Sequence, residues 1–125
     1  MTTLGDLRRE LADHVAGEPV ELTTYDHVPG RVQLPAAFVM AGAPYVEQGQ
    51  TFGSSTVRYQ AVLLTHPSLN SETTDQLDEL LHSVTTRLAV AGWLIELIEQ
   101  PKILDLSGSD VLAVSINVAA VASFP

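Results

Sequence analysis

Two long stretches of apolar and β-branched residues occupy the middle of the chain and predict the central strands of a sheet. Residues 35–44 are apolar at almost every position, which is typical of a strand covered on both faces. Residues 56–65 alternate instead, with Val57, Tyr59 and Leu63 on one face and polar side chains on the other. The two stretches therefore predict a pair of adjacent strands.

The segment between them, residues 45–55, fits neither pattern and predicts a long loop. It holds Gly49 and Gly53, with Phe52 between them. A hairpin connection normally needs only about 2 to 5 residues. The additional residues therefore indicate a role beyond turning the chain, since binding residues are often carried on loops.

Two amphipathic helices are predicted on either side of this hairpin. In residues 3–17, Leu4, Leu7 and Leu11 recur at helical spacing, and Gly17 is placed to end the helix. Residues 72–91 show the clearest helical period in the chain, and Gly92 follows as a stop. Acidic side chains crowd the start of this second helix and a basic one lies near its end, an order that complements the helix dipole.

The remaining apolar segments predict short strands over residues 20–25, 93–99 and 102–106, and a long last strand over residues 111–122. The chain is thus expected to be a single α+β domain, residues 1–125. The expected fold is a mixed or antiparallel four- to five-stranded sheet, with two helices packed on one face and a long projecting β-hairpin loop. Part of the other face would stay open, and exposed apolar patches usually mark interfaces.

Composition favours a globular, self-associating protein. Hydrophobic residues make up 46% of the 125 positions, and charged residues only 17%, against about 25% in ordinary soluble domains. The net charge of −9 and the six basic residues argue against binding a nucleic acid backbone, which requires clustered lysine and arginine. Little charge on a short chain indicates that surface is hidden, most simply by self-assembly.

Cysteine usage and the N-terminus indicate where the protein matures. The chain has no cysteine, which excludes disulfides and thiolate metal sites. The N-terminus lacks the basic-then-apolar order of a signal peptide, and no apolar stretch approaches the roughly 20 residues of a membrane span. These features predict a protein that matures in the cytoplasm in which it is made, without a membrane partner.

No residue pattern indicates catalysis. Histidines at positions 14, 27, 66 and 82 share no metal-ligand spacing, and are expected on the surface or at caps. Asp75, Asp78 and Glu79 form an acidic group that the helix dipole explains without chemistry. Nucleophile-elbow, phosphate-loop and dinucleotide motifs are missing from the sequence. We therefore expect no enzyme, no catalytic residue, no cofactor and no metal.

A series of structural motifs carries a family resemblance. The motifs are Tyr25–Gly30, Pro35–Val39, Gly42–Gly49, Thr51–Gly53 and Thr56–Tyr59. In these the chain resembles small tail proteins of long-tailed actinobacterial phages, namely the tail terminator (tail completion or head–tail joining) proteins. The likeness extends over nearly the whole chain, including the N-terminal helix, the acidic helix and the final alternating strand.

This resemblance implies a structural virion protein. Such a subunit forms a ring, usually of six copies, that caps the finished tail tube, ends its elongation and offers a docking surface for the head. The implied partners are further copies of itself, the major tail tube protein, and a head completion or neck protein. DNA would pass through the lumen without specific binding. The implied location is the tail–neck junction of the virion, after assembly in the host cytoplasm.

Interface residues are hypothesised in and beside the predicted loop. Phe52 would be an apolar anchor between flexible glycines, or would fold back onto its own sheet. Arg58 would pair with a neighbouring subunit's carboxylate, or would be solvated. The full set of candidate oligomer or tube contacts is Tyr45, Glu47, Gln48, Gln50, Thr51, Phe52 and Arg58. The acidic balance would give a negative lumen that does not capture DNA phosphates.

Two alternatives remain open from the sequence. One is another neck or minor tail component, such as a head completion protein, which would bind on the portal side and not at tube ends. The other is a cytoplasmic α+β module that binds a small molecule in the groove below the open sheet face. A deep, closed apolar pocket would favour this second alternative.

Overall fold

The computed structural model describes residues 3–15, 23–25, 35–48, 54–66, 71–106 and 109–123. Within these ranges, two helices and six strands follow one another in the expected order, and the α+β class is confirmed. The helices are α1 (Leu4–Val15) and α2 (Ser71–Val90). The strands are β1 (Thr23–Tyr25), β2 (Ala36–Gln48), β3 (Ser54–Thr65), β4 (Leu94–Ile98), β5 (Lys102–Leu106) and β6 (Ser109–Ser123).

The strands form one open mixed sheet in the order β1-β2-β3-β6-β4. β1 runs parallel to β2, and every other pairing is antiparallel. β4 and β5 pair with successive stretches of the same side of β6, which gives the sheet six strands, one more than expected. The predicted short strands over residues 93–99 and 102–106 are confirmed in position.

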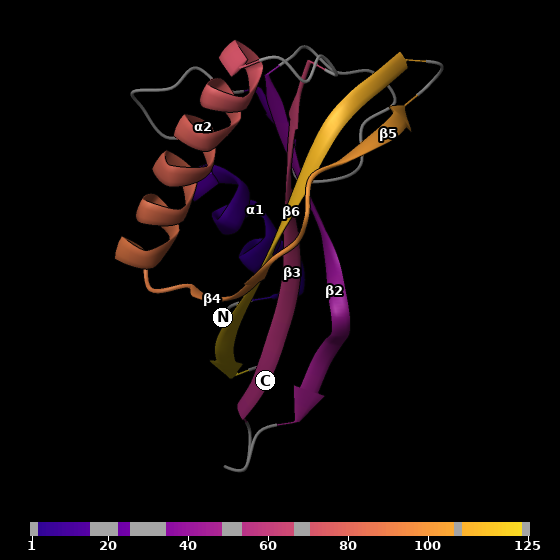
Figure 1. Cartoon of the computed structure of the whole chain (residues 1–125). Coiled ribbons are helices and arrows are strands. Elements are labelled where there is room, and N and C mark those ends of the chain that lie inside the picture. Colours follow the sequence, from indigo (N-terminus) through magenta and orange to yellow (C-terminus); the bar gives the residue numbers. More distant parts are fainter. Residues whose placement is uncertain are drawn as a thin grey trace.

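Both helices pack on the same face of the sheet, as predicted (Figure 1). Alternate residues of β3 and β6 point toward the helices, because successive side chains of a strand leave opposite faces. The apolar stripes of α1 and α2 complete this main core. Its most buried members include Leu11, Val15, Val57, Tyr59, Leu63, Leu80, Val84, Leu88, Ile116 and Val118.

Tyr59 is the largest fully buried side chain of the described core and connects both helices to the sheet. Its hydroxyl donates a hydrogen bond of 2.8 Å to the carbonyl oxygen of Leu4, at the start of α1. Its ring makes edge-to-face contacts with Tyr45 and Trp93, at centroid distances of 5.6 and 6.3 Å. Trp93, directly after α2, donates its indole N–H to Nδ1 of His14 at 3.0 Å. Burial, together with the neighbouring Tyr45 hydroxyl, raises the pKa of Tyr59.

The opposite face carries a second, smaller apolar cluster at one end only. It consists of Ala36, Phe38, Val62, Leu64, Val111 and Ala113. Tyr25 of β1 and Leu104 of β5 pack against it. Toward the other end of the sheet the same face becomes polar, with Arg58, Gln60 and Asn117 in adjacent strands. Among the described residues, no helix covers this polar half, which we call the helix-free face.

The predicted loop over residues 45–55 is wrong, because most of it is strand. β2 continues to Gln48 and β3 begins at Ser54. Gly42 and Pro44 break the apolar pattern, but they lie at a register irregularity between Ala41 and Val46, after which pairing with β3 resumes. The hairpin therefore projects as an arm that extends beyond both helices, and β6 pairs along β3 as far as Ser54 (Figure 1). Only residues 49–53 separate the strands, and they lie outside the described residues.

The helix ends are held by side chains and by one glycine. Thr3 and Asp6 exchange side chain–backbone hydrogen bonds of 3.1 Å in both directions, a capping box at the start of α1. The backbone bond from Thr3 is the main cause that lowers the pKa of Asp6. After α2, Gly92 adopts a φ of 96°, and the N–H of Trp93 reaches back to the carbonyl oxygen of Leu88 at 3.0 Å. The predicted stop at Gly92 is thereby confirmed.

Arg87 joins the two helices. Its Nε donates to the carbonyl oxygen of His14 at 3.2 Å, and a terminal nitrogen donates to that of Val15 at 2.5 Å. These carbonyls belong to the last residues of α1, where no helical donor follows and a cation is favoured by the helix dipole. Burial lowers the pKa of Arg87.

We predict that Arg87→Met lowers the free energy of unfolding by about 1–3 kcal/mol, because it leaves two half-buried carbonyls without donors. Urea denaturation followed by circular dichroism measures the change. Arg9→Met is the matched control: its side chain is 62% exposed and pairs with Asp6 at 3.5 Å, so its loss should cost at most about 1 kcal/mol. Equal effects of the two variants would contradict the bridging role of Arg87.

Candidate interaction surface

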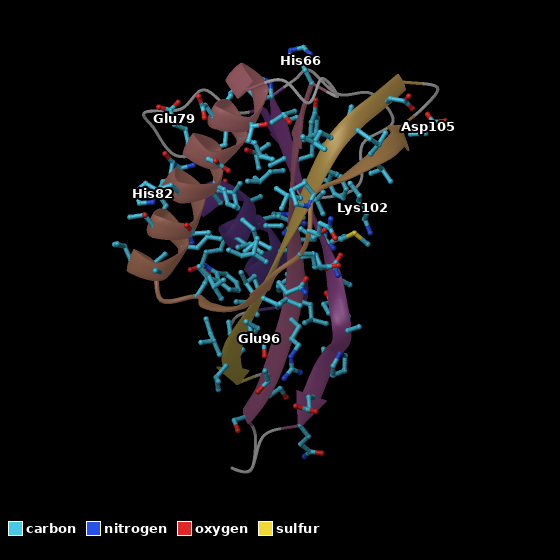
Figure 2. All side chains as sticks on the ribbon, in the orientation of Figure 1. His66, Glu79, His82, Glu96, Lys102 and Asp105 are labelled. Atoms are coloured by element: carbon cyan, nitrogen blue, oxygen red, sulfur yellow. The ribbon has the colours of Figure 1, made fainter. Side chains whose placement is uncertain are left out.

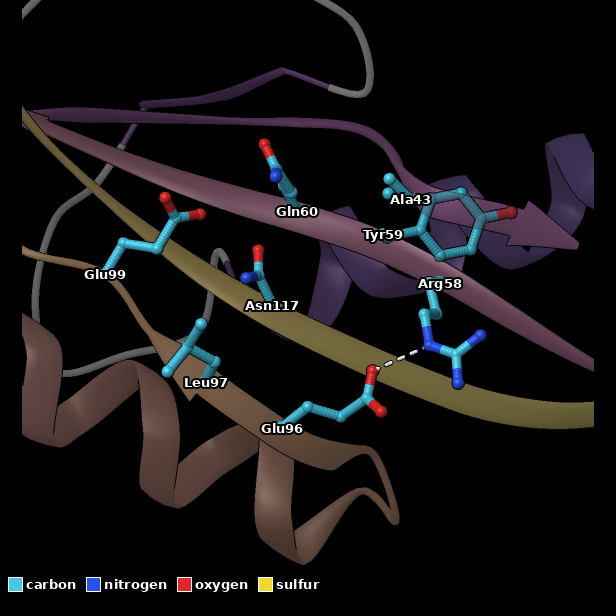
Figure 3. Close-up of a pocket in the computed structure, with 9 residues that line it drawn as sticks. Ala43, Arg58, Tyr59, Gln60, Glu96, Leu97, Glu99 and Asn117 are labelled. Atoms are coloured by element: carbon cyan, nitrogen blue, oxygen red, sulfur yellow. Dashed lines mark hydrogen bonds and ion pairs between the residues drawn. The ribbon is translucent and has the colours of Figure 1, made fainter.

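Arg58 lies at the centre of the helix-free face. It points there because its neighbours in β3, Val57 and Tyr59, point into the core. Its Nε donates to Oε1 of Glu96 at 3.0 Å, and its Nη1 lies 3.4 Å from Oε1 of Glu47. Since Glu47 is on β2 and Glu96 on β4, one arginine links three strands of the sheet. Figure 3 shows the pair with Glu96.

This ion triad is partly shielded from solvent. The Arg58 side chain is 21% exposed, against 32% for Glu96 and 58% for Glu47. Burial by itself would lower the pKa of Arg58, but the hydrogen bond to Glu96 and the charges of both carboxylates outweigh it and raise the pKa. Arg58 is therefore a permanently charged group that is already neutralised within its own chain.

A groove of about 420 Å³ runs beside the triad. Its walls include Gln60, Asn117 and the Arg58–Glu96 pair, and Leu97 and Glu99 lie along one side (Figure 3). Oδ1 of Asn117 is buried and accepts no hydrogen bond from the described residues. The small-molecule alternative called for a deep, closed apolar pocket. This groove instead lies on an open sheet face, and charged and amide groups line it together with apolar ones.

Gly42 allows β2 to lie close against β3 at one end of the groove. A Cβ at this position would lie 2.9 Å from both the carbonyl carbon and the Cβ of Arg58. Glycine is therefore required here by the approach of two backbones, at the point where the β2 register becomes irregular.

Exposed apolar side chains are concentrated on the strands at the two edges of the sheet. β2, on one edge, carries Met40 and Val46. The other edge carries Leu94, Leu97 and Ile98 of β4, Ile103 of β5, and Val121 of β6 beyond its last pairing with β4. The remaining large exposed apolar side chain in the described residues is Val90, at the end of α2.

The interface residues hypothesised from the sequence lie on different faces of the structure, and some lie outside the described residues. Glu47 and Gln48 are exposed on the arm, and Glu47 lies beside Arg58. Tyr45 belongs to the opposite face, where it is half-buried against Tyr59. Gln50, Thr51 and Phe52 lie outside the described residues. The interface role of all these residues stays a prediction.

The sequence leaves two alternatives for Arg58, a neighbouring subunit's carboxylate or solvent, and the structure instead pairs Arg58 with two carboxylates of its own chain. Glu96 is 38 positions away in sequence, so no local pattern joined them. Sequence reasoning also missed Leu94 and Leu97 as exposed edge residues. A usable signal was present, since residues 94–98 are apolar on both faces of a short strand that ends close to Pro101.

The histidines lie apart from one another where they are described. His14 accepts the Trp93 hydrogen bond, whereas His66 and His82 are exposed (Figure 2). His27 lies outside the described residues. Within the described ranges, no three histidine or carboxylate side chains gather as a metal-binding group. In the same part of the chain, neither helix has the length and apolarity needed to cross a membrane.

Comparison with protein-family models and with curated protein sequences finds no match to this chain.

We predict that Gly42→Ala destabilises the protein by about 1–3 kcal/mol, because the added methyl group overlaps the Arg58 backbone. Thermal and urea unfolding measure the effect. Gly5→Ala is the control: a Cβ there would meet atoms no closer than 3.6 Å, and alanine favours the helix, so this variant should gain up to about 1 kcal/mol. A neutral Gly42→Ala would contradict the close approach of β2 and β3.

Proposed function

We propose that this chain is the subunit of a ring that caps the tail tube of a long-tailed phage, ends tube elongation and provides the docking surface for the head. The tail assignment rests on the sequence resemblance in residues 25–59. The observation that supports self-assembly is the one-sided fold: both described helices pack on one face, which leaves a polar sheet face and a projecting arm without a described covering layer.

In the proposed ring, the helix-free face lines the lumen and the helices form the outer wall. The charges on this face suit the passage of DNA. Arg58 is already paired with Glu47 and Glu96, and Glu99 adds a further carboxylate beside the groove. The whole chain carries a net charge of −9. A lumen of this sign repels phosphates, and the described cation at its centre, Arg58, is already paired.

The β2–β3 arm is the proposed contact with the tube. It extends beyond the helices and carries exposed Glu47 and Gln48 close to its tip. Phe52 follows in the segment that joins the two strands. An aromatic side chain is a favoured anchor at protein interfaces. The other ring face would then be left for the head completion or neck protein.

The direct test is to add the purified protein to isolated tail tubes and to locate it by negative-stain electron microscopy. The proposal predicts extra density at one tube end and an arrest of tube growth when free tube subunits are supplied. Binding to portal or head assemblies in place of tube ends would reject this function in favour of the head completion alternative.

We predict that Phe52→Ser weakens binding to tube ends at least tenfold, about 1.4 kcal/mol, while leaving the melting temperature unchanged. Co-sedimentation with tubes gives the affinity. Val90→Ser is the matched control, since Val90 is an apolar side chain 85% exposed at the end of α2, away from the arm. Unchanged tube binding by the Phe52 variant would remove this residue from the contact.

A further inference from the structure

The sheet has two edges that are open along the described strands. Beyond Phe38, β2 pairs only with β3, because β1 reaches no further along it. On the other side of the sheet, β4 pairs only with β6. An edge strand presents unpaired N–H and C=O groups, which can be extended by another strand.

Both edges carry exposed apolar side chains, as contact surfaces between proteins do. Proteins usually protect open edges with charged residues, proline or bulges. β4 carries the charged Glu96 at a register irregularity between Ile95 and Leu97, yet three of its apolar side chains are exposed, Leu94 by 62%, Leu97 by 57% and Ile98 by 39%. On β2, Met40 is 38% exposed. Apolar side chains on both edges favour burial against a partner.

The exposed apolar residues of the two edges lie at the same position along the strand direction. Met40 pairs with Gln60, Gln60 with Asn117, and Asn117 with Leu97. These four residues form a single row across the helix-free face, with an exposed apolar side chain at each end. On the opposite side of the pleat, Val39, Ala61, Ile116 and Ile98 form the adjacent row.

The two edges also match in direction. Each step from β2 through β3 and β6 to β4 is antiparallel, so β2 and β4 run in opposite directions. A rotation about an axis along the strands would place β4 of one copy beside β2 of the next, antiparallel and with the same face inward. Such a head-to-tail contact forms a ring when the rotation closes.

We propose that copies of this chain join edge to edge, with β4 of one copy extending the sheet of the next copy at β2. This inference rests on the ring of the proposed function and names its interface. Pro44 has no N–H and β2 is irregular between Ala41 and Val46. The backbone pairing is therefore confined to Val39–Ala41 against Ile95–Ile98, with Leu97 packed beside Met40. A second copy is the occupant because this chain supplies both complementary edges.

Disulfide trapping tests this contact, since the chain has no cysteine of its own. Two single variants, Met40→Cys and Leu97→Cys, are mixed under mild oxidation and resolved on a non-reducing gel. Within one chain the two positions are three strand spacings apart, about 14 Å. A disulfide requires a Cα separation of at most roughly 7 Å, so any bond between these positions must join two copies.

The expected result is a covalent dimer in the mixture and none from either variant alone. Glu79→Cys, on the outer side of α2 (Figure 2), is the control, and should not trap Leu97→Cys. A single chain carrying both Met40→Cys and Leu97→Cys should give a ladder that ends at the ring. Homodimers of equal yield from each single variant would overturn the head-to-tail contact, and so would the lack of any trapped product.

A charge on the edge provides a second measurement. Leu97→Lys should raise the dissociation constant of the oligomer at least tenfold without changing the melting temperature of the dissociated subunit, because the side chain is exposed in the free subunit. An unchanged oligomer would reject the edge contact even if tube binding persists. Conversely, a trapped ring that does not bind tail tubes would keep the edge contact and reject the proposed function.

Discussion

The arrangement of the whole chain depends on the burial of Tyr59 beneath both helices. Its hydroxyl bonds to the carbonyl of Leu4 at the start of α1, and its ring contacts Trp93, which follows α2. Tyr59 thus holds both helices on one side of β3. Strand geometry then sends Arg58 and Gln60 to the opposite face. The same alternation therefore produces the core and the charged surface.

A sheet covered on one side has surfaces that still need partners. On the described part of the helix-free face, ion pairs within the chain take the place of a partner. Arg58 bridges Glu47 and Glu96 and keeps the central strands together without an apolar layer. The two edges of the sheet have no such pairing, because they expose leucine, isoleucine and methionine side chains. A sheet with a polar central face and apolar edges favours association through its edges. The face itself is then left open to solvent or to a passing polymer. This division of roles is the physical basis of the proposed ring.

Regular periodicity made most of the elements predictable. The 3.6-residue period of α2 and the alternation in β3 and β6 mark their faces directly, and Gly92 marks a helix end. The length of the arm was missed because residues 45–55 hold Gly49 and Gly53 and show no clear alternation, and only the pairing with β3 shows that β2 continues to Gln48. The Arg58–Glu96 pair and the row from Met40 to Leu97 depend on which strands become neighbours, and a local pattern carries no such information.

The proposed ring requires that the subunit assemble with itself through a head-to-tail contact. Light scattering on a sizing column, over a range of protein concentration, measures this self-assembly. We expect a particle several times the 13.4 kDa chain mass, near six copies, that dissociates on dilution. A mass of 13.4 kDa at every concentration would contradict it.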